Sequence, residues 1–508
     1  MNTNFTFVDL FAGIGGFHRA LTSVGGKCVG FSEIAPDAIK SYCANFGLDE
    51  NDNLGDITQL KDLPRHDFMT AGVPCQSWSI AGKKLGFDDD RGQLWNDTLF
   101  LLNKARPKAF IFENVKGLAD PRNKSALNYI FDRIKEAGYH AAKYVLNAYD
   151  YGVPQTRVRI YIVGFREEKY LERFCVPSHG KKRVHLGDVL DERSICPHET
   201  KETKSRWSLS CNEQGFNDYF LFNDLRNGST TIHSWDIQDT TDRQKHICYT
   251  LLRNRRKSIY GILDGNALSL EHFQKLDHTI TEEELEKLVD MEILKHSPYY
   301  YAICSEDKSS LSENDIFLLA HNKNNVIMVD ELKIDKEFRK RKIGVMETLN
   351  RLEADGIVRC TEMRYDFKNT KISTGLNGIN RIFLPTSKIY PTLVASDTND
   401  FVSTESISGD TPQEWRSEFM EKVFKPRKFR KITKSEACRI QGFPSDCILP
   451  DTRARWMKLI GNSVAVPVIR TLAESVVATG VFCESDWNGL SMPKRKSCTG
   501  AIQLNLFA

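Results

Sequence analysis

The sequence predicts an α/β fold in which a helix-covered parallel sheet is interrupted by a second domain. Three observations lead to this prediction. Short apolar runs alternate with helical patterns over residues 5–165, the pattern weakens after about residue 180, and it returns over residues 426–480. Strands that alternate with helices are typical of parallel sheets, because each crossover connection covers a face of the sheet. A chain of 508 residues is long enough for two or three domains.

The sheet domain is expected to begin at Phe5–Phe11, an apolar run that ends in a cluster of glycines. The next elements are a helix from about His18–Val24, a strand over Lys27–Ser32 and a helix over Ile34–Asn45. Three further apolar runs predict strands: Phe68–Gly72, Ala109–Phe112 and Val158–Phe165. We assign residues 1–180 and 426–480 to this domain, and residues 481–508 to a C-terminal tail whose Lys494–Lys496 run suits a solvated end.

The interval 181–425 is predicted to be a separate region. It contains two amphipathic helical patterns, Thr281–Leu294 and Arg339–Glu353. The two share a spacing, in which Leu285, Leu288, Ile293 and Leu294 recur as Leu349, Leu352, Ile357 and Val358. A basic residue follows each set. Two explanations stay open: two winged-helix-like units, or two unrelated amphipathic helices that each end in a turn.

Composition limits the classes of protein. Hydrophobic residues make up 41% and charged residues 27%, which is ordinary for a globular protein, and the net charge is only +3. Any affinity for nucleic acid must therefore come from local patches. The 13 cysteines lack zinc-ligand spacing, so we expect no metal and reduced thiols. We find neither a signal peptide nor a run of about 20 apolar residues that would span a membrane.

The glycine cluster is a candidate nucleotide site. A strand enters the turn Gly13-Ile14-Gly15-Gly16, and Glu33 follows at the end of the next predicted strand. Glycines let the backbone approach a ligand, and an acid at this position commonly binds ribose hydroxyls. The third glycine of the dinucleotide fingerprint is replaced by His18, and a plain tight turn remains the alternative. Asp56, after a third segment, favours a nucleoside-bearing cofactor.

Cys75 is the candidate nucleophile. It follows a predicted strand within Val73-Pro74-Cys75, where the proline restricts the backbone on both sides. The usual fate of a free cysteine is burial in a core. A context of proline, glycine, glutamine and serine favours a reactive thiolate instead.

Two further elements carry charge at strand ends. Glu113 ends an apolar strand, where partial desolvation can raise the pKa of a carboxyl and make it an acid. Arg157 and Arg159 enter another strand and point to one face, which suits an anion or a base edge. A solvated surface position is the alternative for each.

Together these elements resemble the cytosine-5 DNA methyltransferase family. The matching segments are D-L-F-A-G-I-G-G-F (9–17), G-V-P-C-Q-S-W-S (72–79), F-E-N-V (112–115), Y-G-V-P-Q-T-R-V-R-I-Y-I-V-G (151–164), K-I-T-K-S-E-A-C-R-I-Q-G-F-P (431–444) and I-G-N-S-V-A-V-P-V (460–468). The resemblance covers about residues 5–165 and 425–475. It implies a Rossmann-like, S-adenosyl-L-methionine-dependent methyltransferase sheet with a target-recognition domain inserted.

The resemblance also implies the role of each residue. Cys75 would attack C6 of a flipped cytosine, Glu113 would hold N3 and the exocyclic amine, and Arg159 would contact the base carbonyl with Arg157 positioning it. The residues expected at S-adenosyl-L-methionine are Phe11, Ala12, Gly13, Ile14, Gly16, Glu33, Ile34, Asp56, Ile57, Pro74, Asn462, Ser463 and Val464. Ser77–Asp90 resembles the loop that closes over the base.

Double-stranded DNA is the expected partner. The residues that we assign to it are Gln76, Ser79, Lys83, Thr392, Leu393 and Arg430. Residues 425–458 contain ten Lys or Arg and three acids, which predicts strongly salt-dependent binding. The basic runs Arg253–Lys257 and Arg339–Lys342 are either phosphate contacts or solvated faces, and the sequence leaves both open.

Three alternatives were weighed against a DNA enzyme. An RNA methyltransferase of this lineage would tend to lack so large a variable interval. A DNA-binding protein without catalysis would be expected to have lost Cys75 or Glu113. A small-molecule methyltransferase would need neither the interval nor the basic stripe. The resemblance further implies a bacterial or phage modification enzyme, monomeric, cytoplasmic and nucleoid-associated, that acts beside a cognate restriction endonuclease without a stable complex.

Overall fold

A computed structural model describes residues 5–74, 90–176, 184–191, 219–223, 230–261, 265–304, 311–320, 328–329, 345–369 and 375–483. The chain divides into two compact units, Met1–Tyr219 with Ile382–Ala508, and Phe220–Arg381. The second unit falls within the interval 181–425, and the limits of the target-recognition region stay a prediction.

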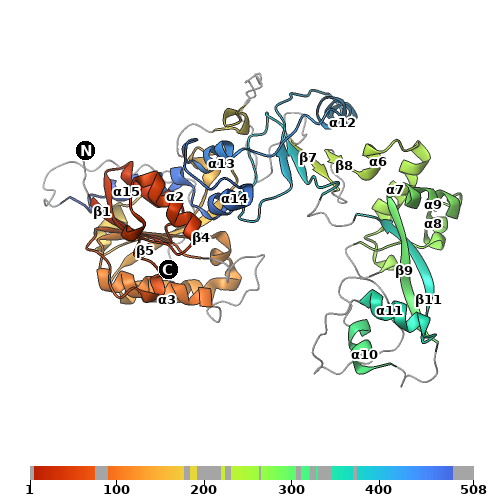
Figure 1. Ribbon diagram of the computed structural model, residues 1–508, viewed down its shortest axis with the longest axis horizontal. Coiled ribbons are helices and arrows are strands. Elements are labelled where there is room, and N and C mark those ends of the chain that lie inside the picture. The colour runs from red at the N-terminus through yellow and green to blue at the C-terminus, as the bar shows by residue number, and fades with distance from the viewer. Residues whose placement is uncertain are drawn as a thin grey trace. The chain divides into compact units, whose positions relative to one another are not determined.

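The first unit is built on a six-stranded sheet of order β2–β1–β3–β4–β6–β5 (Figure 1). The strands are β1 (Phe5–Leu10), β2 (Gly26–Ser32), β3 (Phe68–Gly72), β4 (Ala109–Val115), β5 (His140–Asn147) and β6 (Val158–Phe165). β1 pairs in parallel with β2 and β3, and β3 pairs in parallel with β4. The α/β class is therefore confirmed, and the carboxyl ends of β1 to β4 meet at one edge of the sheet.

One strand departs from the predicted parallel arrangement: β6 runs antiparallel to both β4 and β5. The reason lies in the connection from β5 to β6, residues 148–157, which holds only the short 3-10 helix Ala148–Tyr151. A parallel neighbour needs a crossover of a dozen or more residues, so this short link returns the chain in the opposite direction. Consequently β6 brings its amino-terminal end to the edge where β4 ends.

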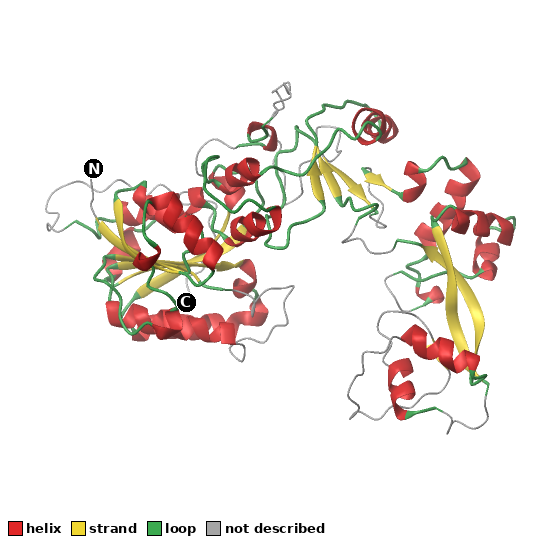
Figure 2. Ribbon diagram, in the orientation of Figure 1, coloured by secondary structure: helices red, strands yellow, loops and turns green. Residues whose placement is uncertain are grey.

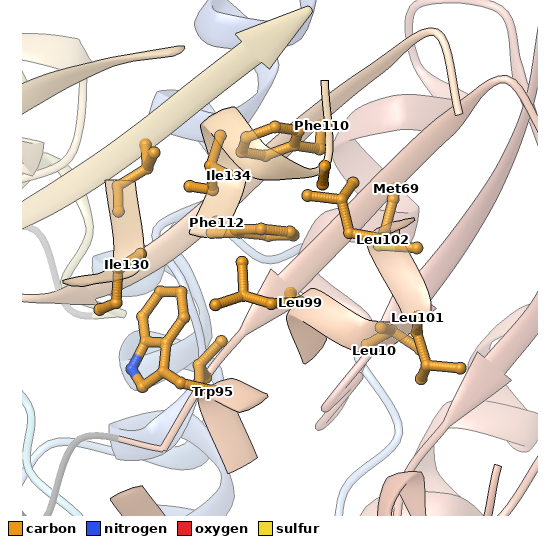
Figure 3. Close-up of a cluster of buried hydrophobic side chains, with 14 of the residues drawn as sticks. Leu10, Met69, Trp95, Leu99, Leu101, Leu102, Phe110, Phe112, Ile130 and Ile134 are labelled. Atoms are coloured by element: carbon orange, nitrogen blue, oxygen red, sulfur yellow. The ribbon is translucent and has the colours of Figure 1, made fainter. Parts of the chain in front are cut away.

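Helices cover both faces of this sheet. α3 (Asp90–Ala105) and α4 (Lys124–Glu136) cover one face, and α1 (Gly16–Thr22) and α2 (Pro36–Phe46) lie on the other (Figure 1). α5 (Glu168–Arg173) follows β6. The core under α3 and α4 contains Leu10, Met69, Trp95, Leu99, Phe110, Phe112, Ile130 and Ile134 (Figure 3). Each such side chain contributes about 1.5–3 kcal/mol by leaving water.

The chain returns to the first unit through α12 (Pro412–Phe419), α13 (Lys434–Gln441), α14 (Arg453–Asn462) and α15 (Val466–Ala478), and α15 packs on α1. The stretch Arg453–Ala478 is long and apolar enough to span a membrane, against our expectation of no such run, but 61% of its most apolar window is buried inside the protein. A core helix passes this test too, so the stretch is weak evidence for a membrane.

The second unit contains two helix–turn–strand segments. In the first, α9 (Glu282–Asp290) leads into β9 (Leu294–Ile303), and in the second, α11 (Val345–Ala354) leads into β11 (Val358–Phe367). The first helix ends at Asp290, before the predicted limit of Leu294, because Leu294 begins the strand. The predicted start of the second helix, residues 339–344, lies outside the described residues. β9 and β11 form a long antiparallel ribbon with helices near both ends (Figure 2).

The two segments are arranged alike around this ribbon. Leu294 faces Phe367 and Val358 faces Ile303, so each strand begins where the other ends. Each segment also has a core of its own, one containing Leu285 and Leu288 and the other Leu349 and Leu352. The recurring spacing therefore marks equivalent buried positions. Whether the segments are winged-helix units stays a prediction.

The remaining described elements complete the fold. They are β7 (Tyr219–Phe222), β8 (Thr231–Ile232), α6 (Ser234–Ile237), α7 (Asp242–Asn254), α8 (Leu270–Leu276), α10 (Glu313–Ala320), β10 (Met328–Val329), β12 (Arg381–Phe383) and β13 (Asp400–Val402). A four-stranded sheet has the order β13–β12–β7–β8, and β10 joins β9. Among the described cysteines, Cys175 is disulfide-bonded, so the expectation of reduced thiols is wrong there. Scattered cysteines in a sequence carry no pairing information.

Asp9 is a buried carboxyl within β1. Its side chain is 0% exposed, and Oδ1 accepts a hydrogen bond from Thr70 Oγ1 at 3.0 Å. Burial raises the pKa of this carboxyl well above its usual range, and the bond from Thr70 opposes the change only in part. The contribution of Asp9 to stability is therefore full below the unfolded pKa of about 4 and is lost as the pH rises toward the folded pKa.

Asp9→Asn should remove this pH dependence and keep the acceptor for Thr70. Between pH 5 and pH 8, the free energy of unfolding of the parent should fall relative to that of the variant. The difference should be at most about 1.4 kcal/mol per pH unit, and urea unfolding at both pH values measures it. Asp67→Asn is the matched control, because hydrogen bonds from Thr6 and Lys108 outweigh burial and lower the pKa of Asp67. Asp67 is therefore ionised in both the folded and the unfolded protein between pH 5 and pH 8, so Asp67→Asn should keep the pH dependence of the parent over this range. Identical pH dependence in the parent and Asp9→Asn would refute the assignment.

Candidate active site

The loop after β1 adopts an unusual backbone. Phe11 has a φ of 53°, Gly13 of 56° and Gly15 of 82°, all in the left-handed region. A non-glycine residue rarely adopts this conformation, and such strain gathers at functional sites. A Cβ on Gly15 would lie 2.1 Å from the ring of Phe46, whereas one on Gly13 would meet nothing within 4 Å. Gly15 is thus needed for packing, and Gly13 borders open space.

Glu33 closes this loop. Its Oε2 accepts a hydrogen bond from the amide of Gly13 at 2.8 Å, and Oε1 accepts from the amides of Ile34 and Ala35 at 2.8 and 2.9 Å. The carboxylate therefore joins the end of β2 to the glycine loop. Beside it, the side chain of Ile34 is 68% exposed.

The other predicted cofactor residues near this loop differ in exposure. Ala12 and Ile14 are buried, and the Ala12 amide donates to Ser32 O at 3.0 Å. Ile57 is buried in the core under α3, so only its backbone can face a ligand. Asp56 is exposed, and its Oδ1 caps the 3-10 helix Ile57–Gln59 by accepting from the Thr58 amide.

Asn53 is a residue that the sequence analysis missed. Its Oδ1 accepts hydrogen bonds from the amides of Glu33 and Gly55 at 3.1 and 3.2 Å, and its Nδ2 donates to Glu33 O at 2.9 Å. Asn53 therefore fixes Glu33 through the backbone. A lone asparagine in a polar loop gives no signal in the sequence.

The segment Asn462–Val464 joins the glycine loop from the far end of the chain. A Cβ on Gly16 would lie 2.6 Å from Val464 Cγ2, so the absence of a side chain at Gly16 lets the two backbones approach. Ser463 is buried and its hydroxyl donates to Ile460 O, while Asn462 is exposed. The structure thus brings these predicted residues together with Gly16.

The predicted nucleophile lies outside the described residues, together with Gln76, Ser79, Lys83 and the predicted closing loop at 77–89. The chain is described up to Pro74. Just before it, Val73 O accepts a hydrogen bond from Asn114 Nδ2 at 3.0 Å, and Gly72 is the sheet partner of Glu113. The start of the loop that carries Cys75 is therefore held beside the predicted acid. Asn114 was missed by the sequence analysis.

Glu113 and Arg159 form an ion pair across neighbouring strands. Arg159 Nε lies 3.2 Å from Glu113 Oε1, and both side chains are largely buried. The register allows this contact because Val115 faces Arg159 and Glu113 lies two residues earlier on the same face of β4. Burial raises the pKa of Glu113, although the charges of Arg159 and Arg157 oppose the change. The Glu113 carboxyl therefore keeps its proton at a higher pH than the carboxyl of an exposed glutamate does.

Arg157 has a positioning role in this structure. Its guanidinium is buried and donates to Leu393 O, Gly461 O and Ser463 O at 3.1, 3.1 and 2.7 Å. These contacts occupy the guanidinium with backbone carbonyls rather than with an anion or a base edge, and they are compatible with the positioning role that the resemblance implies for Arg157. Both terminal nitrogens of its guanidinium donate to backbone carbonyls, because a buried cation must be hydrogen-bonded to be tolerated.

The predicted recognition residues Thr392 and Leu393 lie beside Arg157. Thr392 Oγ1 donates to Thr156 O, and the Leu393 amide donates to Gln155 Oε1 at 3.1 Å. Leu393 is buried, so its side chain does not offer a surface to DNA in this structure. Gln155, also buried, donates to Gln441 Oε1 at 2.7 Å and continues the network.

Arg430 and the basic stripe are less available than the sequence suggests. Arg430 donates to both carboxylate oxygens of Glu436 at 2.8 Å, and Glu436 is 0% exposed. Seven of the ten basic residues in 425–458 lie within 4.0 Å of an acid, and five of those acids come from elsewhere in the chain. We therefore expect this stripe to make DNA binding less salt-dependent than its composition alone predicts.

The assembled site can bind a nucleoside and act on a polar ring. The glycine loop, Glu33 and exposed Ile34 offer amides, a carboxylate and an apolar side chain, which suits an adenosine-bearing ligand. Glu113 and Arg159 offer an acid and a cation at the next strand ends. In the part of the chain that the structure describes, no three His, Cys, Asp or Glu side chains gather as a metal site.

Comparison with known proteins agrees with this geometry. Residues 5–478 match the family model described as C-5 cytosine-specific DNA methylase. The type II methyltransferase M.HgiBI of Herpetosiphon aurantiacus is 38% identical over 490 residues, covering 94% of this chain and 98% of that protein. M.BanI of Aneurinibacillus aneurinilyticus is 29% identical, covering 94% and 96%. The chain therefore belongs to the C-5 cytosine-specific DNA methylase family and is a DNA (cytosine-5-)-methyltransferase.

Proposed function

We propose that this methyltransferase transfers a methyl group from S-adenosyl-L-methionine to C5 of a cytosine in one specific double-stranded site, with Cys75 as its nucleophile. The observation that carries the proposal is the ion pair of Glu113 and Arg159 beside Gly72, the residue from which the loop bearing Cys75 departs. Addition to a cytosine ring requires an acid, a cation and a thiol, and Cys75 follows three residues after Gly72 in the sequence.

The residues around the glycine loop fit S-adenosyl-L-methionine. Open space beside Gly13 leaves room for the ligand, and Glu33 is held where a ribose hydroxyl could donate to it. Phe11 and Ile34 would flank the adenine, with Asp56 and the backbone of Ile57 at its edge. Pro74, Asn462, Ser463 and Val464 would enclose the methionine portion. When bound, S-adenosyl-L-methionine supplies an electrophilic methyl group.

The chemistry of this chain's own residues then follows from C5 being a weak nucleophile. A thiolate of Cys75 adds to C6, so that a C–S bond forms and electron density moves toward N3 and C5. Glu113, whose pKa is raised by burial, can hold a proton at N3 as that charge develops. Arg159 fixes the carboxyl and offers its remaining donors to the base carbonyl. Loss of the C5 proton and of the C–S bond later restores the ring and the thiolate.

We further propose that residues 181–425 recognise the target site, because the base must leave a duplex chosen by sequence. Thr392 and Leu393 connect this region to Gln155 and Arg157. Relatives named type II methyltransferases support a role beside a cognate restriction endonuclease, acting without a stable complex. We expect a monomer in a bacterial cytoplasm.

Gly13→Ala should weaken cofactor binding more than it lowers the stability of the fold. The new methyl would occupy the open space, so the Kd for S-adenosyl-L-methionine should rise at least about tenfold, and backbone strain should cost about 1–2 kcal/mol. Gly15→Ala is the matched variant, because its Cβ overlaps Phe46 and should cost about 2–4 kcal/mol of stability. Titration calorimetry and urea unfolding separate the two effects. Unchanged cofactor affinity in Gly13→Ala would remove the loop from the cofactor site.

Glu113→Gln should slow methylation without releasing DNA. The amide cannot deliver a proton to N3, so the single-turnover rate should fall by about 100-fold or more, while the Kd for DNA stays within about threefold. The exposed Glu136→Gln is the control and should change neither quantity. Rapid-quench methylation and fluorescence anisotropy give the two readouts. A parental rate in Glu113→Gln would exclude this carboxyl from the chemistry.

Cys75→Ala should abolish methylation and leave cofactor binding nearly unchanged. Bisulfite sequencing of plasmid DNA from cells that express the parent should reveal protected cytosines within one short motif. Plasmid DNA from cells that express the variant should reveal none. Protection in both would remove Cys75 from its role, and protection in neither would point to RNA as substrate.

A further inference from the structure

The second unit carries one exposed segment with an unusual combination of side chains. In residues 253–261, which follow α7, Arg253, Arg256 and Lys257 are exposed, and Ile259 is 75% exposed. Among the described residues, Ile259 is the most exposed large hydrophobic side chain. We propose that residues 253–261 form a DNA contact of this methyltransferase, with Lys257 at the phosphates and Ile259 against base edges. This inference rests on the proposed role of the region in target recognition.

The segment is held by a buried ion pair. Arg255, which interrupts the exposed residues, points inward and donates to Asp366 Oδ1 of β11 at 2.7 Å. The Arg255 carbonyl also accepts from the amide and side chain of Asn266 at 2.7 and 3.1 Å. The residues of the basic run Arg253–Lys257 therefore have different roles. Arg255 holds the segment against β11 and is no phosphate contact, whereas Arg253, Arg256 and Lys257 face solvent.

A second arginine holds the other end. Arg364 of β11 donates to Tyr260 O at 2.7 Å and to Ala267 O at 3.2 Å, and its guanidinium lies 3.4 Å from the ring centre of Tyr299. Tyr260 itself is buried. Ile259 is thus flanked by a residue whose backbone and side chain are both fixed. A single exposed isoleucine is ordinary, but one presented on a doubly anchored turn that follows three exposed cations is suited to recognition.

The charges around Ile259 favour a polyanion. Within the described residues, Lys257 has no carboxylate within 4 Å, and Arg253 rests over the ring of Tyr249 at 5.7 Å. Exposed cations release counterions when they meet phosphates, which provides affinity independent of sequence. An apolar tip can then contact a thymine methyl or enter between base steps.

The helices that precede β9 and β11 are poor candidates for the same task. A winged-helix protein would be expected to insert such a helix into the major groove. Here the exposed positions of α9 include Glu282, Glu283 and Asp290, and those of α11 include Glu347 and Glu353. Acidic faces are repelled by phosphates. The distribution of charge therefore favours the 253–261 segment over either helix.

The test uses full-length protein with the Lys257→Ala and Ile259→Ala variants. Lys275→Ala and Leu276→Ala on α8 are matched controls, since both side chains are exposed but lie beside Glu271 and Asp277. Anisotropy measures the Kd for a duplex with the methylated site and for one without it, over a range of salt concentrations. A circular dichroism spectrum and a urea unfolding curve that match those of the parent verify that each variant is folded, because the substitutions lie in the second unit.

Lys257→Ala should weaken binding to both duplexes and reduce the salt slope by about 1. Ile259→Ala should weaken binding to the site about tenfold and affect the other duplex much less. The controls should match the parent. If the parent methylates its site and neither variant changes its affinity, the segment is no DNA contact. If the parent methylates no DNA at all, the proposed function fails instead.

Discussion

The buried guanidinium of Arg157 is the interaction on which the rest of the site depends. It donates to carbonyls 236, 304 and 306 residues away along the chain. A buried cation that loses its partners costs several kcal/mol. The segments around Leu393 and around Gly461–Ser463 are therefore both held against Arg157, and moving either one away from it would be costly. Its charge also opposes the effect of burial on the pKa of Glu113. One residue thus links assembly of the site with the protonation of its acid.

The glycine loop depends on the close approach of three backbone segments. Glu33 holds the glycine loop through the amide of Gly13, and Gly16 admits Val464 from the carboxyl-terminal helices. The segment 462–464 follows Gly461, one of the residues bound by Arg157. The glycine loop, Glu33 and the segment 462–464 are therefore coupled through short contacts. A displacement of one of them would displace the others.

Ion pairing decides which cations of this enzyme are available to bind DNA. The stripe at 425–458 is basic in composition, yet most of its cations are engaged by acids such as Glu436, Asp397 and Asp37. Such pairs leave fewer charges for phosphates. Exposed cations in the second unit are then stronger candidates for contacts with DNA phosphates. The reason is that the distribution of charge in space, rather than its sum along the sequence, decides where a polyanion binds.

The sequence by itself determined the α/β class, the glycine turn, and the positions of Glu33, Glu113 and Arg159 at strand ends, because each signal is local: a strand, a turn and a polar residue at its end. It also revealed the recurring Leu285 and Leu349 spacing, since burial repeats with helical period. Only the tertiary structure decided the antiparallel β6, the inward turn of Arg157 and Arg255, and the roles of Asn53 and Asn114. Those depend on partners far along the chain, and a residue type in a sequence does not state which distant carbonyl or carboxylate it will meet.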